Sequence, residues 1–302
     1  MPPSRYQKQI LFSGIAAEGQ KRIGESRVLI VGCGALGCVV SDAMVRAGVG
    51  HVRIADRDFV ELSNLQRQIL YDEQDVADHL PKAVAAERRL RRVNSEITIE
   101  PVVADVDWTN IVELAQDASL ILDGSDNFEV RYLINDVSLE TGIPWIFTGC
   151  TGSVGQVMPI FPNQSACLRC LMPAPPPPGT TETCDTVGVL GPAIGVVASL
   201  QAAIALKILA GHGDVCKARA AHSKLYDDAS FSAVIDGAVD QTGVEFGQVR
   251  RQPRGKALRV AAIDAHREVV AMPCRAQVQL PGFPRCGLQH DVKHAFIGRV
   301  AK

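Results

Sequence analysis

The sequence predicts a Rossmann-like, doubly wound α/β fold, with a mostly parallel sheet and a C-terminal antiparallel extension. Three observations lead to this prediction. Short β-branched runs alternate with stretches of helical periodicity in the first half, which is typical of βαβ units. A glycine-rich turn joins the first such run to the first helical stretch. After residue 211 the periodicity weakens and only short strand-like runs remain.

Each element is predicted from the length of its run and from the residues that bound it. Buried strands are predicted at residues 27–31, 51–55, 98–103, 120–122, 145–148 and 155–161. Helices are predicted over 36–46, 82–92 and 127–141, and short strands at 224–227, 258–263 and 268–272. Ligands of doubly wound sheets lie beyond the carboxyl ends of the strands. The residues that follow the first, second and fourth strands are therefore the candidates for a site.

Two segments of unusual composition follow. Residues 171–185 include four consecutive prolines, which cannot join a helix or a central strand, so an exposed crossover loop is predicted there. Residues 186–206 carry only uncharged side chains and are long enough to raise the question of a membrane span. Interrupting glycines favour instead a core helix that begins near Pro192. We expect one domain over residues 1–236 and a separate extension over 237–302.

Composition excludes several classes of protein. The chain has 302 residues, 47% of them hydrophobic, and a net charge of −2, which excludes disordered and collagen-like classes. It has no basic stripe with interleaved aromatic residues, so no nucleic-acid partner is expected. The polar N-terminus predicts no secretory signal, and the odd count of nine cysteines favours reduced thiols over a disulfide framework. We expect a cytoplasmic protein that does not span a membrane.

The strongest local motif is a GxGxxG turn formed by Gly32, Gly34 and Gly37, directly after the first predicted strand. Glycines let the backbone approach phosphates, and the first turn of the following helix, from Ala35, offers free N–H groups to an anion. Asp56 ends the second strand, where a carboxylate can hold ribose hydroxyls. A purely structural glycine turn is the alternative. These features alone also suit NAD, so an NAD-dependent oxidoreductase is the alternative function.

Cations and carboxylates follow at the same predicted edge. The segment 63–68 (SNLQRQ) supplies Arg67, and Lys82 follows a proline; both suit a triphosphate, although a solvated loop with surface cations is the alternative. Beyond the fourth strand, Asp123 and Asp126 could hold Mg²⁺, with Asp126 favoured. The alternative is that Asp126 or Asn127 caps the next helix.

Taken in order, these motifs resemble the ThiF/MoeB/HesA family, the bacterial relatives of ubiquitin-activating E1 enzymes. The resemblance covers about residues 5–228 and is carried by six motifs: RYxxQ (Arg5, Tyr6, Gln9), GxGxxG, Asp56, SNLQRQ, Pro81–Lys82 and Ser125–Asn127. It implies a homodimer that binds Mg-ATP and adenylates the C-terminal Gly-Gly carboxylate of a ubiquitin-like sulfur carrier of the ThiS or MoaD type, releasing pyrophosphate. It also implies a separate sulfur donor and a role in thiamine or molybdopterin synthesis or in a related thiolation.

The resemblance assigns roles to matching positions. Nucleotide-binding positions are Gly32, Gly34, Ala35, Gly37, Asp56, Asn64, Arg67, Lys82, Asp126 and Asn127. Among them, Arg67 and Lys82 would contact phosphates and Asp126 would bind Mg²⁺. Lys8 stands where the family has an arginine that reaches the γ-phosphate of the other protomer. Because an ammonium group cannot make a planar bidentate contact, we expect a weaker grip there.

Cys167 and Cys170 form a CxxC pair, which in the family is half of a tetrahedral zinc site. The second half is incomplete here: Cys286 stands at one ligand position and Phe283 at the other, with Cys274 or His290 as the alternative fourth ligand. A pair of reduced thiols without metal is the alternative.

Cys184 matches a family cysteine that in some members forms a thioester or acyl disulfide with the carrier, while other members adenylate without it. Lys8 and the incomplete second cysteine pair also motivate a third hypothesis, a catalytically silent scaffold that binds the carrier.

Overall fold

The computed structural model describes residues 4–176, 184–213, 221–224 and 232–233. Its centre is an eight-stranded sheet of order β3-β2-β1-β4-β5-β6-β7-β8. The strands are β1 (Arg27–Val31), β2 (His51–Ala55), β3 (Thr98–Val102), β4 (Leu120–Asp123), β5 (Trp145–Thr151), β6 (Val154–Ile160), β7 (Ala221–Lys224) and β8 (Ser232–Ala233).

The strand directions confirm the predicted fold class. Strands β3, β2, β1, β4 and β5 are parallel, and β6, β7 and β8 continue the sheet in antiparallel pairs. The strand predicted at 224–227 overlaps β7 only at Lys224. Its remainder, and the strands predicted at 258–263 and 268–272, lie outside the described residues.

The three long helices predicted in the first half are present within a residue at each end, as α3, α5 and α7. The helical elements are α1 (Gln7–Leu11), α2 (Ala16–Glu25), α3 (Ala35–Ala47), η1 (Leu62–Asn64), α4 (Glu73–Ala77), α5 (Lys82–Val93), α6 (Ile111–Leu114), α7 (Phe128–Thr141), α8 (Leu168–Leu171), α9 (Cys184–Val187), α10 (Gly191–Lys207) and η2 (Ile208–His212).

Two hydrophobic cores lie on the two faces of the sheet. On β1, Val28 and Ile30 face the core beneath α3, α5 and α10, while Leu29 and Val31 face the core beneath α6 and α7. Successive side chains of a strand point to opposite faces, so a strand buried on both faces is apolar throughout. This burial explains why β1 has the continuous apolar sequence VLIV after Arg27.

The uncharged segment forms a core helix, as predicted. The helix over Gly191–His212 is the one element among the described residues that is long and apolar enough to cross a membrane. Pro192 lies in its first turn, and its inward residues, including Ile194 and Val197, are buried against α3 and the sheet. Gln201, fully buried on the same helix, donates to the backbone oxygen of Asp123 at 2.9 Å.

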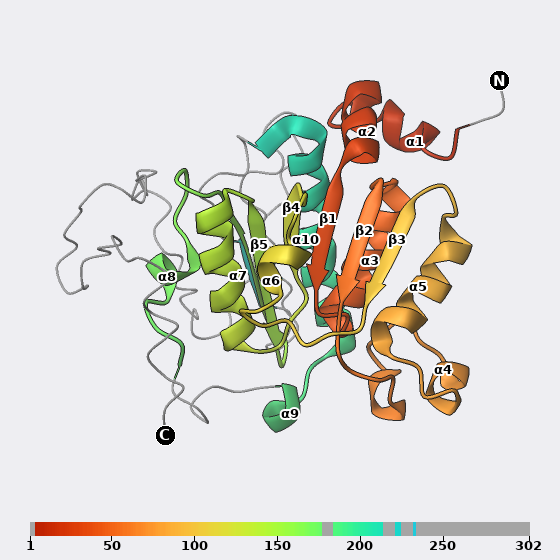
Figure 1. The fold of residues 1–302 in the computed structure, drawn as a ribbon, viewed down its shortest axis with the longest axis vertical. Helices are drawn as coiled ribbons and strands as arrows, with labels where there is room; N and C mark the ends of the chain where they lie inside the picture. Colours follow the sequence, from red (N-terminus) through yellow and green to blue (C-terminus); the bar gives the residue numbers. More distant parts are fainter. Residues whose placement is uncertain (1–3, 177–183, 214–220, 225–231, 234–302) are drawn as a thin grey trace, which may run out of the picture.

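The edge of the sheet where the parallel strands begin and the edge where they end have different surroundings (Figure 1). The parallel strands all end at the edge where α4 and α9 lie, whereas α1 and α2 lie at the edge where the strands begin. Strand order reverses between β1 and β4, because β2 lies on one side of β1 and β4 on the other. In doubly wound folds the loops at such a reversal form the ligand-binding crevice.

Candidate nucleotide-binding site

The glycine turn begins directly after β1. Gly32 has φ +88°, a conformation that side-chain-bearing residues rarely adopt. A Cβ built on Gly37 would lie 2.0 Å from the Gly32 oxygen, and one on Gly124 would lie 2.4 Å from the same atom. Only glycines allow the start of α3, the end of β1 and the loop after β4 to meet through their backbones.

Gly34 occupies the N-cap of α3 and provides no side-chain cap. The first backbone N–H groups of a helix have no partner within the helix, and the helix dipole favours negative charge at this end. The turn thus places the N-terminus of α3 at the reversal point, a position compatible with the role predicted for Gly34, Ala35 and Gly37.

Asp56 braces this turn from β2. One carboxylate oxygen, Oδ2, accepts from the Cys33 N–H at 2.6 Å, and the other, Oδ1, accepts from the Asp58 N–H at 2.8 Å. Burial raises the pKa of Asp56, while these two N–H bonds and the charge of Lys82 act in the opposite direction. Each carboxylate oxygen has a second lone pair. Asp56 can therefore hold the turn and still accept a ribose hydroxyl.

Tyr71 also hydrogen-bonds to the glycine turn. Its hydroxyl donates to the Cys33 oxygen at 2.7 Å, and its ring is buried in the core. Tyr71 is not among the residues predicted from the sequence, because an isolated aromatic residue in a loop carries no local signal for this contact. Hydrogen bonds thus fix the backbone of Cys33 at both its N–H and its carbonyl oxygen.

Lys82 is the first residue of α5, and its side chain contacts the segment that follows Asp56. Its side chain is 9% exposed, and its Nζ lies 2.9 Å from Asp58 Oδ2. Arg57 pairs with Asp105 at 2.6 Å. The charge of Asp105 and its hydrogen bond raise the pKa of Arg57, with smaller contributions from the charges of Asp58 and Asp126. Arg57 and Asp58 are not among the residues predicted from the sequence, although they are the two residues after Asp56.

The SNLQRQ segment folds around η1. Asn64 is buried, and its Oδ1 accepts from the Glu61 N–H at 3.2 Å in a capping box. Arg67 is half-buried and donates from Nη1 to the Ser63 oxygen at 2.9 Å. Both residues lie in the connection between the crevice end of β2 and α5, so their predicted roles toward a nucleotide are compatible with their positions.

The two aspartates after β4 differ sharply. Asp123 is fully buried: Oδ1 accepts from the Ser125 N–H and hydroxyl at 2.9 and 2.7 Å, and Oδ2 faces Arg131 Nε at 3.2 Å. Burial raises the pKa of Asp123, and the charge of Arg131 opposes this shift. The suggestion that Asp123 shares a Mg²⁺ site is therefore wrong, because the folded chain occupies both its oxygens and leaves none at the surface.

Asp126, by contrast, is exposed in the loop. Asn127 caps α7, its Oδ1 accepting from the Val130 N–H at 2.9 Å, so the capping alternative is confirmed for Asn127. In the described part of the chain, no three His, Cys, Asp or Glu side chains could hold a metal together. A single carboxylate nevertheless suits Mg²⁺, which commonly takes one or two carboxylates and completes its shell with water and substrate phosphates.

Lys8 lies far from this crevice along the sheet. Three of its neighbours in the RYxxQ motif pin α1 to the opposite edge: Arg5 donates to the Val93 oxygen at 2.9 Å, Gln9 donates to the Ala47 oxygen at 2.9 Å, and the Tyr6 hydroxyl accepts from Asn94 at 2.9 Å. Lys8 itself is exposed on α1. Helix α1, which carries Lys8, lies at the edge opposite the one where the parallel strands end (Figure 1), so Lys8 does not meet the predicted site residues that follow the strands of its own chain.

Of the cysteines singled out, two are close together. The sulfur atoms of Cys167 and Cys170 lie 3.6 Å apart on and beside α8. Cys286, the proposed third zinc ligand, lies outside the described residues, as do Phe283, Cys274 and His290. Cys184 is the first residue of α9, at the edge where the parallel strands end. Most of the proline-rich crossover, residues 177–183, also lies outside the described residues.

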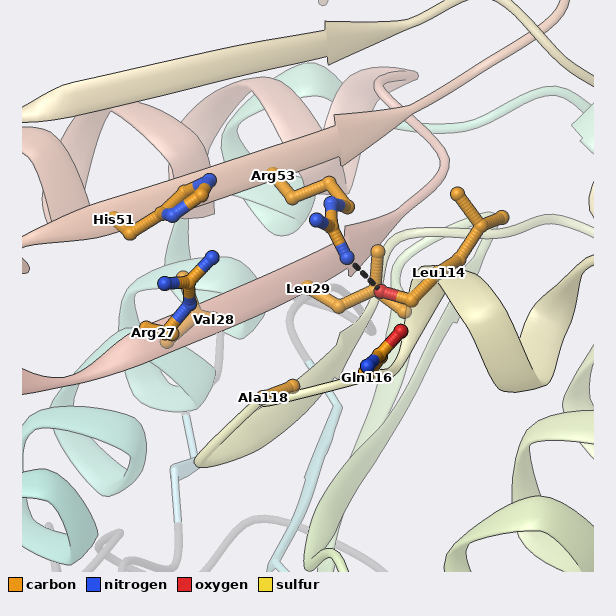
Figure 2. A pocket seen from close by; sticks show the side chains of 8 residues that line it. All are labelled: Arg27, Val28, Leu29, His51, Arg53, Leu114, Gln116 and Ala118. Atoms are coloured by element: carbon orange, nitrogen blue, oxygen red, sulfur yellow. Dashed lines mark hydrogen bonds between the residues drawn. The ribbon is translucent and has the colours of Figure 1, made fainter.

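A small cavity lies elsewhere, on the face of the sheet that packs against α6 (Figure 2). It measures about 10 Å³ and is lined by residues of β1 and β2, among them Arg53, which donates to the Leu114 oxygen at 2.6 Å. This volume is about enough for one water molecule. The cavity is therefore distinct from the crevice and too small for a nucleotide.

The sheet order and the glycine turn at its reversal point define a protein of the doubly wound α/β class. The chain belongs to the ThiF family, whose model matches residues 6–235. It is 50% identical over 207 residues to the sulfur carrier protein ThiS adenylyltransferase of Bacillus subtilis, covering 68% of this chain and 61% of that protein. It is 40% identical over 257 residues to the sulfur carrier protein adenylyltransferase of Thermus thermophilus, covering 83% of this chain and 88% of that protein.

Solved structures share the fold. The crystal structure of E. coli MccB with ATP superposes with a TM-score of 0.65 at 22% identity, covering 77% of this chain and 71% of that chain. At this identity the likeness concerns the fold alone. The chain spans less than two thirds of the B. subtilis relative, so substrates and partners require their own argument.

Proposed function

We propose that this protein uses Mg-ATP to adenylate the C-terminal Gly-Gly carboxylate of a ubiquitin-like sulfur carrier. The observation that supports the proposal is the glycine turn of a ThiF-family chain, where Asp56 accepts from the Cys33 N–H and from the Asp58 N–H, and Asp58 in turn contacts Lys82. The names of the two relatives support the reaction class. The product would feed sulfur transfer for thiamine or molybdenum cofactor synthesis or a related thiolation, with sulfur from a separate donor. We place this activity in the cytoplasm.

The chemistry requires positioning and charge neutralisation. An oxygen of the carrier carboxylate attacks the α-phosphorus, and the bond from that phosphorus to the oxygen bridging to the β-phosphate breaks, with the electron pair leaving on pyrophosphate. The nucleophile is already ionised at neutral pH, so the chain need not supply a general base. Its N–H groups at α3 and the cations Arg67 and Lys82 hold the phosphates. Mg²⁺, when bound at Asp126, would neutralise the pyrophosphate.

Asp58 prepares Lys82 for this task. The 2.9 Å contact compensates the charge of Nζ, although Lys82 is buried. A triphosphate brings several negative charges and can compete with Asp58 for the ammonium group. Asp58 would therefore hold Lys82 in place and yield it to the phosphates.

Lys8 supports a homodimer within this proposal. Because α1 is pinned to the edge opposite its own crevice, Lys8 can reach a γ-phosphate only in the crevice of a second protomer. Mixing Lys8→Ala with Lys82→Met subunits tests this point, since a mixed dimer would contain one site with both lysines intact. Recovered activity on mixing supports the exchange of Lys8 between protomers, and the absence of recovery in mixed dimers contradicts it.

Two cysteine roles belong to the same proposal. Cys167 and Cys170 would bind zinc together with Cys286, and metal content that is unchanged in Cys167→Ser would contradict this assignment. Cys184 would act on the carrier after adenylation. Cys184→Ala should then retain ATP–pyrophosphate exchange, and loss of exchange in a folded variant would contradict that order of events.

The deciding experiment is ATP–pyrophosphate exchange by the purified protein with Mg²⁺ and each Gly-Gly-ending carrier from the same source. Exchange with one carrier supports the proposal and identifies the pathway. The control is the same carrier without its final glycine, which should be inactive. ATP binding with no exchange for any carrier would favour the scaffold hypothesis, and binding of NAD in place of ATP would favour the oxidoreductase.

A further inference from the structure

Gln68, the last residue of SNLQRQ, lies against the glycine turn. Its side chain is buried, with 3% exposed. A Cβ built on Gly34 would have Gln68 Nε2 as its nearest neighbour, at 4.0 Å. Three residues further on, Tyr71 fixes the same segment to the Cys33 oxygen at 2.7 Å. The amide of Gln68 is therefore held beside the N-terminus of α3.

The folded chain does not use this amide fully. Gln68 Oε1 is buried and has no hydrogen-bond partner among the described residues, and in the same part of the chain Nε2 donates to no protein acceptor. A buried polar side chain without partners is unfavourable, and a ligand that offers an acceptor to Nε2 would give this amide a hydrogen bond that the fold does not supply. The neighbouring buried polar residue of the motif, Asn64, has its oxygen satisfied within the η1 turn.

We propose that Gln68 is a nucleotide-binding residue whose amide nitrogen donates a hydrogen bond to the phosphate at the N-terminus of α3. This proposal rests on the proposed use of ATP and adds a residue to which no role was assigned. Helix N–H groups and a neutral amide would then contact one phosphate from two directions. A neutral donor orients that group without adding charge, whereas Lys82 adds a charge without fixing direction.

Substitution by methionine separates binding from folding. Methionine matches glutamine closely in volume and removes both polar atoms, including the unpartnered oxygen. If the fold does not use the amide, the nucleotide-free Gln68→Met variant should melt at the same temperature as the wild type or higher. The matched control is Gln66→Met, since Gln66 is exposed two residues earlier in the same motif.

The measurement is calorimetric titration of wild type, Gln68→Met and Gln66→Met with ATP, AMP and adenosine. Loss of a hydrogen bond to a charged oxygen should weaken ATP and AMP binding by about tenfold or more, because such bonds are stronger than neutral ones. Adenosine affinity should be unchanged, and Gln66→Met should match the wild type throughout.

Three results would overturn the assignment: unchanged ATP affinity in Gln68→Met, an equal loss for adenosine, or a lower melting temperature without nucleotide. The last would show that the fold itself uses the amide. Failure of the proposed function has a different signature, because wild-type protein would then bind ATP and show no exchange with any carrier.

Discussion

Removing the charge of Arg131 should destabilise the protein strongly, because Arg131 is the cationic partner of the fully buried Asp123. Arg131 is 7% exposed; its Nη2 also donates to the Ser125 and Thr148 oxygens at 2.8 and 3.1 Å, and its guanidinium lies 5.3 Å from the Phe128 ring centre. The perturbation is Arg131→Met, which keeps a long side chain and removes every donor.

The expected cost follows from the contacts that remain. Removing one partner of a buried ion pair costs about 3–5 kcal/mol. Asp123 would still accept from the Ser125 N–H and hydroxyl and face the Thr148 N–H at 3.2 Å, so we expect the lower end, about 3 kcal/mol. For a domain of this size, that loss lowers the melting temperature by roughly 6–12 °C.

Urea unfolding at two pH values is the assay. Burial already raises the pKa of Asp123, and loss of the Arg131 charge raises it further. A carboxyl whose pKa is higher in the folded state favours folding below its unfolded pKa of about 3.9, and this contribution is lost as pH rises through the folded value. The deficit of Arg131→Met relative to wild type should therefore be smaller at pH 5 than at pH 7.5.

The double variant Arg131→Met/Asp123→Asn removes the unpaired charge as well. It should recover part of the lost stability at pH 7.5, since the remaining amide no longer places a charge in the core. A double variant no more stable than Arg131→Met, or a deficit that is larger at pH 5, would refute this account of the pair.

Three further predictions concern the crevice. Gly37→Ala places a Cβ against the carbonyl oxygen of Gly32 and should lower both the melting temperature and the affinity for ATP. The control is Gly195→Ala on α10, where a Cβ meets nothing within 4 Å, and it should be neutral or stabilising by about 0.5–1 kcal/mol. Equal effects of the two substitutions would contradict this reasoning. Lys82→Met should bind ATP at least about tenfold more weakly by calorimetry, since a charge-assisted contact is lost, and wild-type affinity would remove Lys82 from the phosphate site. Asp126→Asn should melt at the wild-type temperature, because the side chain is exposed. Its rate of ATP–pyrophosphate exchange at limiting Mg²⁺ should fall by about tenfold or more. An unchanged dependence of that rate on Mg²⁺ would exclude Asp126 as the metal ligand.

The crevice could be predicted from the sequence because its signals are local. The glycine turn, Asp56 and Asp126 each follow a β-branched run, and the order of runs indicates one common edge. Long helices were predicted because apolar spacing extends over three turns or more. The short helices α1 and α4 were not, since five residues are too few to show a period.

The contacts that were missed join residues far apart in the chain. Lys82 meets Asp58 across 24 positions, and Tyr71 meets Cys33 across 38. No spacing rule connects such pairs before the sheet is assembled. Asp123 illustrates the same limit from the other direction: its position at a strand end suggested a metal ligand, while only the packed structure reveals Arg131 beside it.

The backbone contact between Gly32 and Gly124 has a consequence for binding. Each glycine excludes a side chain on the other, since a Cβ on Gly32 would lie 2.7 Å from the Gly124 oxygen. The turn proposed to receive phosphate and the loop that carries Asp126 therefore pack directly against each other, backbone to backbone. A receptor assembled before its ligand arrives spends little of the interaction energy on ordering itself. Changes of shape during turnover should accordingly arise in the segments around this rigid base, and the base should serve as the fixed reference against which they move.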